Sequence, residues 1–492
     1  MKTLIAFSLT ALISIGFISA QSYQKQLEQM QKRVENRLGQ QRDRVDLRFA
    51  NQMRRLWIQK QLNPGLDLPN IPKPDNPTIF DPADDLVPNG QDFDVVTTPA
   101  PTLPAPKPKL PTAMPAPSPE VETAKASLES EASSTFFGTT LEFRYPKDLD
   151  LGLRYKVDEN KIAQAWEKLD ESKASLVALQ LVQKANRMAL NDWGMALLVA
   201  NAGKKMFPYD KNARTVFHWF ALSKAGYIST VCYDRGKVFL MLPAKQTLYG
   251  KTFLKGKDNR KFYVLDLEGT EISPRTAKIF DGKYPEAGRV MDISIRQRPN
   301  IGGTTQMRKL RFAYRGGTYH LSVPVNKQLV NFYRKYPFTD LNVYMAAPLS
   351  AEASQVLTDS LGQMVASMPQ DEAVNFLLRF VQTAFAYKTD QQQFGKERYL
   401  FAEETLYYPY SDCEDRSVLF AYLVKEILDL EVVGLVFPGH AATAVHIPQA
   451  KGGDSVRYQG KSYVVCDPTY INATYGMTLP DARGKSVKVV AF

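Results

Sequence analysis

Cys413, His440 and Asp467 are the residues of this sequence whose types and order suit nucleophilic chemistry. The 492-residue chain has 3 cysteines and 4 histidines, so few pairs of a thiol and a base can be formed. A thiol that attacks an amide carbonyl needs a base to take its proton, and the base needs a third group that fixes its tautomer. Because Cys, His and Asp fill these three roles, we predict a catalytic triad.

Cys413 is predicted to lie in the first turn of a helix. Ser411 is followed three residues later by Glu414, just before an apolar run, which is the pattern of a capping box with Ser411 as the N-cap. At a helix start, the free amide groups and the macrodipole favour a thiolate and lower its pKa. The neighbouring carboxylates oppose this shift and Arg416 supports it, so the sequence leaves the net sign open.

His440 and Asp467 are predicted to meet across a hairpin. His440 opens one strand pattern, Asp467 ends the next, and the turn signal Lys451-Gly-Gly-Asp454 lies between them. Paired residues of an antiparallel hairpin have a constant index sum, so a hairpin centred on this turn places His440 opposite Asp467. His446 needs a centre near residue 456, in strand-like sequence, and stays an alternative base.

The predicted chemistry is acyl transfer through a thioester. The Cys413 thiolate attacks the carbonyl, His440 moves the proton to the leaving amine, and Asp467 orients the imidazole. The backbone amide of Cys413 is a candidate oxyanion donor. The candidates for a second donor are Tyr387, Tyr408 and Tyr410.

These motifs resemble the transglutaminase-like superfamily over about residues 370–480. The carrying features are a Cys before a helix, Gly439-His440-Ala at a strand start and Asp467-Pro-Thr at a strand end. The resemblance implies a papain-like α+β catalytic domain. Ala442 stands where many members have Trp, which bears on the substrate class.

The Asp412-Cys413-Glu414-Asp415 run is similar to periplasmic cysteine proteases of the same superfamily, some of which bind calcium beside the nucleophile. We predict no metal and no cofactor, and leave calcium near Asp412 and Glu414 open. A metal site built from Cys413, His440, His446 and Asp467 is a weaker alternative, because no Cys-x-x-Cys or His-x-x-x-His pattern supports it.

The chain is predicted to be exported and divided into five parts. These are a signal peptide at 1–20, a basic helical segment at 21–62, a Pro-rich disordered linker at 63–133, a helical and then β-rich domain at 134–349, and a transglutaminase-like catalytic domain at 350–492. The signal could also stay as an uncleaved anchor. An odd, small number of cysteines argues against a disulfide framework. The fold class is α+β.

An internal similarity suggests that the middle domain is a degenerate copy of the catalytic one. In both, a helix is followed by three strand patterns, the last ending in Asp266 or Asp467. The first copy has about Lys211 where the second has Cys413, and about Gly236 where it has His440. Such a copy would be non-catalytic.

We therefore expect an exported cysteine peptidase or amidase that acts on protein or peptide substrates. A non-catalytic cell-envelope scaffold that keeps the fold and a protein-crosslinking acyltransferase remain alternatives. The net charge of +11 does not indicate a nucleic-acid partner, because an exported protein seldom meets nucleic acid. We expect the protein to be periplasmic or secreted, with a cell-envelope partner that binds through the N-terminal helix and linker.

Overall fold

The computed structural model describes residues 57–60, 73, 75–79, 92–93, 128–155, 157–256, 259–269, 274, 277–280 and 287–492. The predicted signal peptide, most of the basic helical segment and the proline-rich stretch lie outside these ranges. Among the described residues, no helix is both long and apolar enough to cross a bilayer. The described part is a mixed α+β structure, as predicted.

Two short strands correct the predictions for the N-terminal region. Residues Trp57–Lys60 form strand β1, which pairs with β9 (Ala277–Phe280), so the prediction of helix up to residue 62 is wrong here. Asp92–Phe93 form β2 beside β16 (Ser455–Tyr458), within the predicted disordered linker. Pairing with distant edge strands decides the conformation of both.

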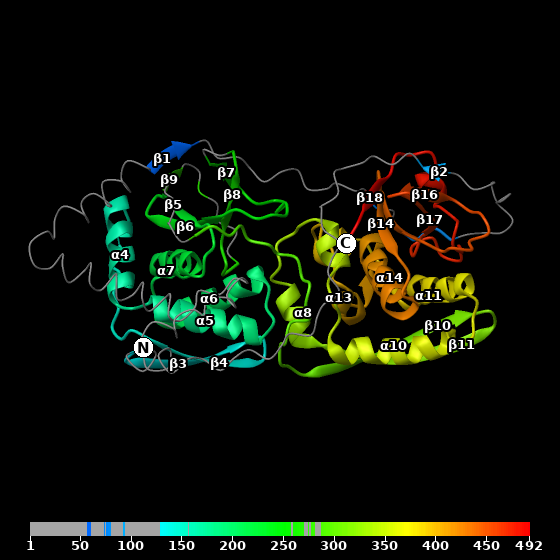
Figure 1. Cartoon of the computed structure of the whole chain (residues 1–492), viewed down its shortest axis with the longest axis horizontal. Helices are drawn as coiled ribbons and strands as arrows, with labels where there is room; N and C mark the ends of the chain where they lie inside the picture. Colours follow the sequence, from blue (N-terminus) through cyan, green and yellow to red (C-terminus); the bar gives the residue numbers. More distant parts are fainter. Residues whose placement is uncertain are drawn as a thin grey trace, which may run out of the picture.

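The first half of the described fold, residues 128–295, builds a hairpin, a helical layer and a sheet. Its elements are β3 (Ser130–Phe136), β4 (Thr139–Tyr145), α4 (Glu159–Glu171), α5 (Ser175–Arg187), α6 (Asp192–Met206), α7 (Lys211–Lys224), β5 (Thr230–Asp234), β6 (Lys237–Leu242), β7 (Phe253–Lys255), β8 (Lys261–Leu265) and β9. The helices lie between the hairpin and the sheet (Figure 1).

The second half, residues 301–492, repeats these layers beside the first (Figure 1). Its elements are β10 (Thr305–Tyr314), β11 (Gly317–Asn326), α8 (Lys327–Tyr333), α9 (Leu341–Met345), α10 (Ala351–Val365), α11 (Gln370–Ala384), β12 (Ala386–Tyr387), α12 (Asp390–Phe394), α13 (Ala402–Tyr407), β13 (Tyr410–Ser411), α14 (Cys413–Leu428), β14 (Val432–Phe437), β15 (His440–Val445), β16, β17 (Lys461–Cys466), the 3-10 turn η1 (Pro480–Ala482) and β18 (Lys488–Val490).

The hairpin β10–β11 moves the boundary between the two halves. It falls in the range assigned to the first domain, 134–349, yet it packs on α10 and α11 of the second half. We therefore place the division before Thr305 instead of at residue 349. The alternating sequence pattern of a hairpin shows that one of its faces is buried, but it does not indicate which helices pack against that face.

The two halves share one topology. The sheet of the first half contains the order β9-β5-β6-β8-β7, and that of the second contains β18-β14-β15-β17-β16, with every pairing in both runs antiparallel. In the first half α5 packs on β4, α6 on β3 and α7 on β6. In the second half α10 packs on β11, α11 on β10 and α14 on β15.

The register of the sheets matches individual residues between the halves. Lys211 and Cys413 each open the helix that leads into the sheet. Lys237 and His440 each open the second strand after a two-residue turn. The position of His440 therefore corresponds to Lys237, one residue beyond the predicted Gly236.

The third position follows from the next ladder. Leu240, three residues after Lys237, pairs with Leu265, and Thr443, three residues after His440, pairs with Cys466. The residue that follows each of these strand ends is aspartate. Asp266 in the first half and Asp467 in the second therefore hold the same place.

An arginine supports this correspondence. Arg214 of α7 donates to the carbonyl oxygen of Phe207, just after α6, at 2.9 Å. Arg416 of α14 donates to the carbonyl oxygen of Phe385, just after α11, also at 2.9 Å. In both halves the arginine of an Arg-Ser/Thr-Val run ties the entering helix to the end of the preceding one, which supports a duplication.

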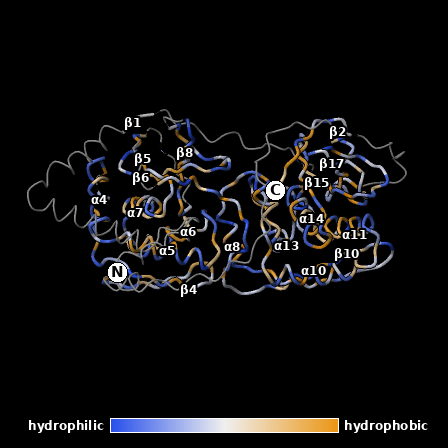
Figure 2. Tube along the Cα trace, viewed as in Figure 1, coloured by the Kyte–Doolittle hydropathy of each residue, from blue (hydrophilic) through white to orange (hydrophobic). Residues whose placement is uncertain are grey.

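Apolar residues of the helical layers hold each half together. The buried faces of α7, α11 and α14 belong to one large core cluster, and a smaller cluster covers the outer face of the second sheet. Figure 2 shows hydrophobic segments along the helices between hairpin and sheet. Burial of these side chains is the main stabilising contribution to the fold.

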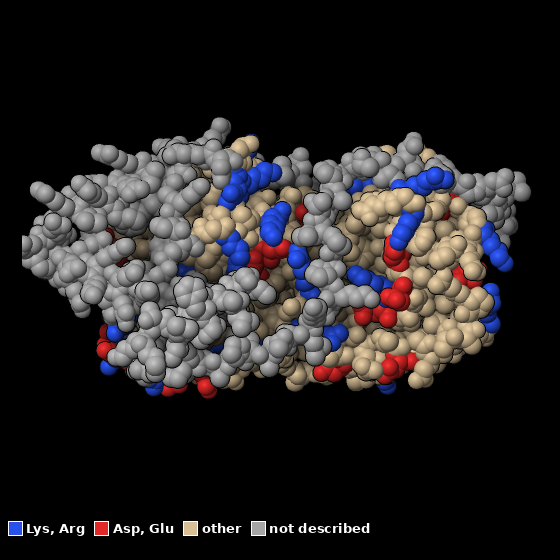
Figure 3. Space-filling view, in the orientation of Figure 1, with Lys and Arg blue, Asp and Glu red and all other residues tan. Residues whose placement is uncertain are grey.

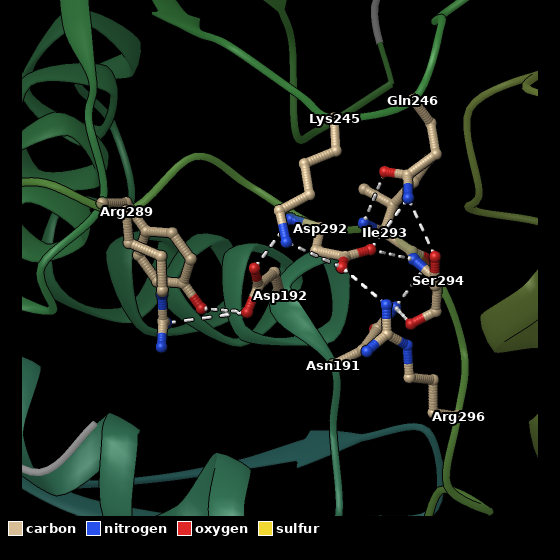
Figure 4. Close-up of polar contacts among 10 residues, drawn as sticks. Asn191, Asp192, Lys245, Gln246, Arg289, Asp292, Ile293, Ser294 and Arg296 are labelled. Carbon is tan, nitrogen blue, oxygen red and sulfur yellow. Dashed lines mark hydrogen bonds and ion pairs between the residues drawn. The ribbon is translucent and has the colours of Figure 1, made fainter. Parts of the chain in front are cut away.

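A polar network fixes the segment that leaves the first half (Figure 4). Asp192, at the start of α6, accepts from the backbone amide of Asp292 and from the Tyr227 hydroxyl, each at 2.8 Å. The Asp292 carboxylate in turn accepts from Gln246 at 2.8 Å and from Ser294 at 3.0 Å. Although burial acts in the opposite direction, these donors lower the pKa of Asp292.

Candidate active site

His440 and Asp467 form a buried pair in the second half. His440 Nε2 lies 2.7 Å from Asp467 Oδ2, and the side chains are 3% and 0% exposed. The other Asp467 oxygen accepts the backbone amides of Thr469 at 2.9 Å and Tyr470 at 3.0 Å. The structure thus brings these two predicted site residues together, with the carboxylate held by the chain that follows it.

The route to this pair differs from the predicted hairpin. The Lys451–Asp454 stretch does not join β15 directly to β17, because β16 lies between them in sequence and pairs on the far edge of β17. His446 does not join the site. Its Nδ1 meets the carbonyl oxygen of Ser462 at 2.9 Å in an exposed position.

The carboxylate decides the charge preference of His440. Burial lowers the pKa of the imidazole, but attraction to Asp467 and the hydrogen bond between them outweigh burial, and Glu414 adds to the attraction. The net effect is a raised pKa, which makes the imidazole a stronger proton acceptor.

Cys413 is the first residue of α14, but the N-cap differs from the prediction by one residue. Asp412 is the N-cap, and Asp415 completes a reciprocal capping box, with the Asp412 amide 3.3 Å from Asp415 Oδ2. Ser411 instead lies in β13 and accepts from Arg416 Nε at 3.2 Å. Both Ser-x-x-Glu and Asp-x-x-Asp satisfy the capping pattern, and the pairing of β13 with β12 selects the second.

The Cys413 thiol is protonated in this conformation. Its side chain is buried, and Sγ donates to Glu414 Oε2 at 3.0 Å. Burial and then the Glu414 charge raise the pKa of the thiol, and the opposing influence of Lys73 is smaller. The pKa shift whose sign the sequence left open is therefore upward. Burial and the Glu414 charge outweigh the favourable effect of the helix N-terminus on the thiolate.

His440 has one ring nitrogen without a hydrogen-bond partner among the described residues. This nitrogen, Nδ1, is buried. One turn along α14, the Ser417 hydroxyl donates at 3.4 Å to the carbonyl oxygen of Ala441, the neighbour of His440. Glu414 also influences the His440 pKa. The start of α14 and the start of β15 therefore lie together, although the thiol hydrogen bond goes to Glu414.

Lys73 is the site residue that sequence reasoning missed. Its ammonium lies among four carboxylates and is 3% exposed; the distances are 3.1 Å to Asp390, 3.0 Å to Glu397, 2.7 Å to Asp412 and 2.9 Å to Glu414. No sequence pattern around Lys73 identifies it as a site residue, because its partners lie more than 300 residues away in the sequence. Glu414 Oε2 thus accepts from both the ammonium and the thiol.

The carboxylate cluster, defined as Asp390, Glu397, Asp412, Glu414 and Asp415, holds more negative charge than Lys73 balances. Burial and mutual repulsion raise the pKa of Asp390, Asp412 and Asp415, and burial raises that of Glu397 to about 7. The pKa of Glu414 alone is lowered, because Lys73 and the thiol outweigh its burial. The cluster therefore retains protons near neutral pH.

Three cluster members also fit a hard cation. Oxygen atoms of Asp390, Asp412 and Asp415 lie within 4.8 Å of one another, and oxygen-only donor sets suit calcium. Lys73 contacts two of these residues. These oxygen donors thus suit calcium, the cation that the resemblance left open. The Lys73 ammonium would compete with the calcium ion for the same carboxylates.

Of the three predicted tyrosine donors, Tyr387 has the closest link to the thiol. Burial raises its pKa, and the next largest cause is the Cys413 charge. Tyr408 packs edge-on against Phe394, and Tyr410 lies under the Lys388 ammonium at 3.9 Å.

The other two cysteines are structural. Cys232 and Cys466 are buried and free, and burial raises the pKa of both thiols.

Comparison of the chain with protein-family models, with curated proteins and with solved structures finds no match.

Proposed function

We propose that the second half is a transglutaminase-like thiol enzyme that cleaves amide bonds of peptides or proteins, in an exported protein of the cell envelope. The observation that carries the proposal is the orientation of His440. Its Nε2 is bound to Asp467, while its Nδ1 is buried and has no hydrogen-bond partner among the described residues. A buried imidazole oriented by a carboxylate, with its second nitrogen free, is suited to exchange a proton with a thiol.

The reaction begins when the thiol hydrogen moves from Glu414 toward His440 Nδ1. The imidazole takes the proton, the thiolate attacks the substrate carbonyl, and the leaving amine takes the proton back as the C–N bond breaks. Water then gives a proton to His440 and attacks the thioester, which releases a carboxylic acid and restores the thiol. Asp467 stabilises the imidazolium in both halves of this cycle.

The resting site is closed in this proposal. The thiol is buried and protonated, and Lys73 fixes Glu414, its hydrogen-bond acceptor. Catalysis requires that Cys413 leave Glu414 and that the substrate reach it. Displacement of the segment that carries Lys73 does both.

Hydrolysis is favoured over crosslinking on general grounds, because water is always present and an amine acceptor needs its own binding site. The scaffold alternative differs in one property: it leaves Cys413 an ordinary buried thiol. The two can be separated by the reactivity of this thiol.

The experiment is alkylation by iodoacetamide at pH 6 to 9, read at each cysteine by mass spectrometry. Wild type is compared with Lys73→Ala, His440→Ala and the double variant. We expect Cys413 to react slowly in the closed wild type, faster than Cys232 and Cys466 in Lys73→Ala, and more slowly again when His440 is also removed. If Cys413 reacts no faster than the other two cysteines in wild type and in Lys73→Ala, the enzyme proposal fails and the scaffold remains.

A further inference from the structure

A cavity of about 450 Å³ opens in the first half at the place that the triad occupies in the second. Its lining includes Lys211, Lys237 and Asp266, the residues that correspond by register to Cys413, His440 and Asp467. Its volume is within the range of natural ligand pockets. We infer that this cavity is a non-catalytic binding site for an acidic peptide segment.

The residues at the triad positions exclude thiol chemistry there. Lys211 Nζ lies 2.8 Å from Asp266 Oδ2, so an ion pair replaces the imidazole–carboxylate pair of the second half. No thiol stands at the helix start, because that residue is Lys211. The site can bind a peptide but lacks the groups that would cleave it by this mechanism.

The cavity is open where its counterpart is closed. Lys211 is 45% exposed, whereas Cys413 is 0% exposed. Tyr155 and Tyr209 stand at the rim with 97% and 87% exposure, which is unusual for side chains of this size. Tyrosine is enriched at binding surfaces because it offers a rigid apolar ring and a polar tip.

The lining carries charges of both signs, with three basic residues, Arg154, Lys211 and Lys237, and three acidic ones, Asp210, Asp266 and Glu268. Arg154 and Lys237 line the cavity, and neither has an ion-pair partner among the described residues. On the face drawn in Figure 3, basic and acidic side chains of the described residues lie next to one another. Two unpaired cations at one cavity suit a carboxylate.

The remaining lining selects a peptide as the carrier of that carboxylate. Asp210 is 6% exposed; its Oδ1 caps the Ala213 amide at 2.9 Å, while its Oδ2 is buried without a hydrogen-bond partner among the described residues. This oxygen needs a donor, such as a backbone N–H. Leu240 and Leu265 supply an apolar wall. A carboxylate, an N–H donor and an apolar side chain occur together in an acidic peptide.

The choice of peptide rests in part on the proposed function, since the matching position of the second half is the proposed amide site. A first half that holds the chain and a second half that cuts it would act on one substrate. The test must therefore report on the cavity without any turnover.

The probe is a pooled library of N-acetylated, C-amidated hexapeptides with Glu fixed at the third position, beside the same library with Gln. Full-length Cys413→Ala protein is immobilised, and bound peptides are counted by mass spectrometry. We expect Glu peptides to be enriched over Gln peptides. Lys237→Ala and Arg154→Ala should each weaken binding of a selected peptide about tenfold, the size of one lost charged hydrogen bond.

Lys245→Ala is the matched control, because this exposed lysine belongs to the same half but pairs with Asp292 outside the cavity. It should leave binding unchanged, and Lys237→Arg should retain most of it. The inference is overturned if Glu peptides show no enrichment, or if Lys237→Ala and Lys245→Ala weaken binding equally. Either result leaves the alkylation of Cys413 unaffected, so the two proposals fail independently.

Discussion

The two halves of this chain place different side chains on the same framework. In both, a helix start, a strand start and a strand end meet beside one sheet. The first half fills these positions with Lys211, Lys237 and Asp266 and leaves a cavity; the second fills them with Cys413, His440 and Asp467 and buries them. The fold supplies the meeting point, and under the two proposals above the three residues at these positions determine whether a half binds or cleaves.

The halves also differ in what lies between the last two helices of the helical layer. In the first half, α6 is followed by α7 after only four residues. In the second, residues 385–412 separate α11 from α14 and bring Asp390 and Glu397 to the Lys73 ammonium. Part of the carboxylate cluster thus comes from an insertion that the first half lacks.

The largest expected difference between the halves is in catalysis. Cys413→Ala should abolish peptide hydrolysis, a loss of about 10³-fold or more, because it removes the thiol that attacks the carbonyl in the proposed mechanism. Lys211→Ala, at the corresponding position, should leave the rate constant for bound substrate unchanged. The measurement is the hydrolysis rate of a fluorogenic peptide chosen from the bound library. Equal rates for Cys413→Ala and wild type would refute the assignment of the nucleophile.

A smaller but still large loss is expected when the orienting carboxylate is changed. Asp467→Asn removes the charge that raises the pKa of His440, and we expect the hydrolysis rate to fall by about 10²- to 10⁴-fold. Asp266→Asn, the matched change, should disturb only the ion pair with Lys211 and binding in the cavity. If both aspartates have the same effect on rate, the functional division between the halves is wrong.

Loss of Lys73 should affect the second half selectively. Lys73→Met leaves the carboxylate cluster without its cation, and removing one partner of a buried ion pair costs about 3–5 kcal/mol. We expect a lower melting temperature by calorimetry, partly restored by added calcium through Asp390, Asp412 and Asp415. Lys461→Met, which loses a half-exposed pair with Glu431, is the control and should change little.

The smallest effect is a pH dependence confined to the second half. The pKa of His440 is raised by folding, so its contribution to stability is complete below the unfolded value of 6.5 and is lost as pH rises through the folded value. Wild type should therefore lose some stability above pH 6.5, and His440→Gln should lack this part. His446→Gln serves as the control. Equal pH slopes for wild type and His440→Gln in urea unfolding would contradict the raised pKa.

The sequence predicts those parts of the site that depend on local order. The helix start at Cys413 and the strand end at Asp467 follow from short patterns, and the correspondence of Lys211 with Cys413 follows from the order of elements. The cap moved from Ser411 to Asp412 because two overlapping patterns fit and a strand pairing chose between them.

Features that depend on residues far away in the sequence could not be predicted from it. Lys73 reaches its carboxylates across more than 300 residues, and its flanking prolines predict only an extended chain. The strand Trp57–Lys60 reads as helix until β9 is known to lie beside it. The sign of the thiol pKa needed the burial of Cys413 and the position of Glu414.

The N-terminal strands have a consequence for how the thiol becomes accessible. Strand β1 adds to the sheet of the first half, whereas Lys73, the bridge of Ile79 to Ile471 and strand β2 attach to the second. A single cut in the chain between residues 93 and 128 would remove their covalent tie to the rest of the fold but not these contacts. Retention of Lys73 would then depend on an association between two separate chains, so dilution after the cut would take the ammonium away from Glu414, the hydrogen-bond acceptor of Cys413.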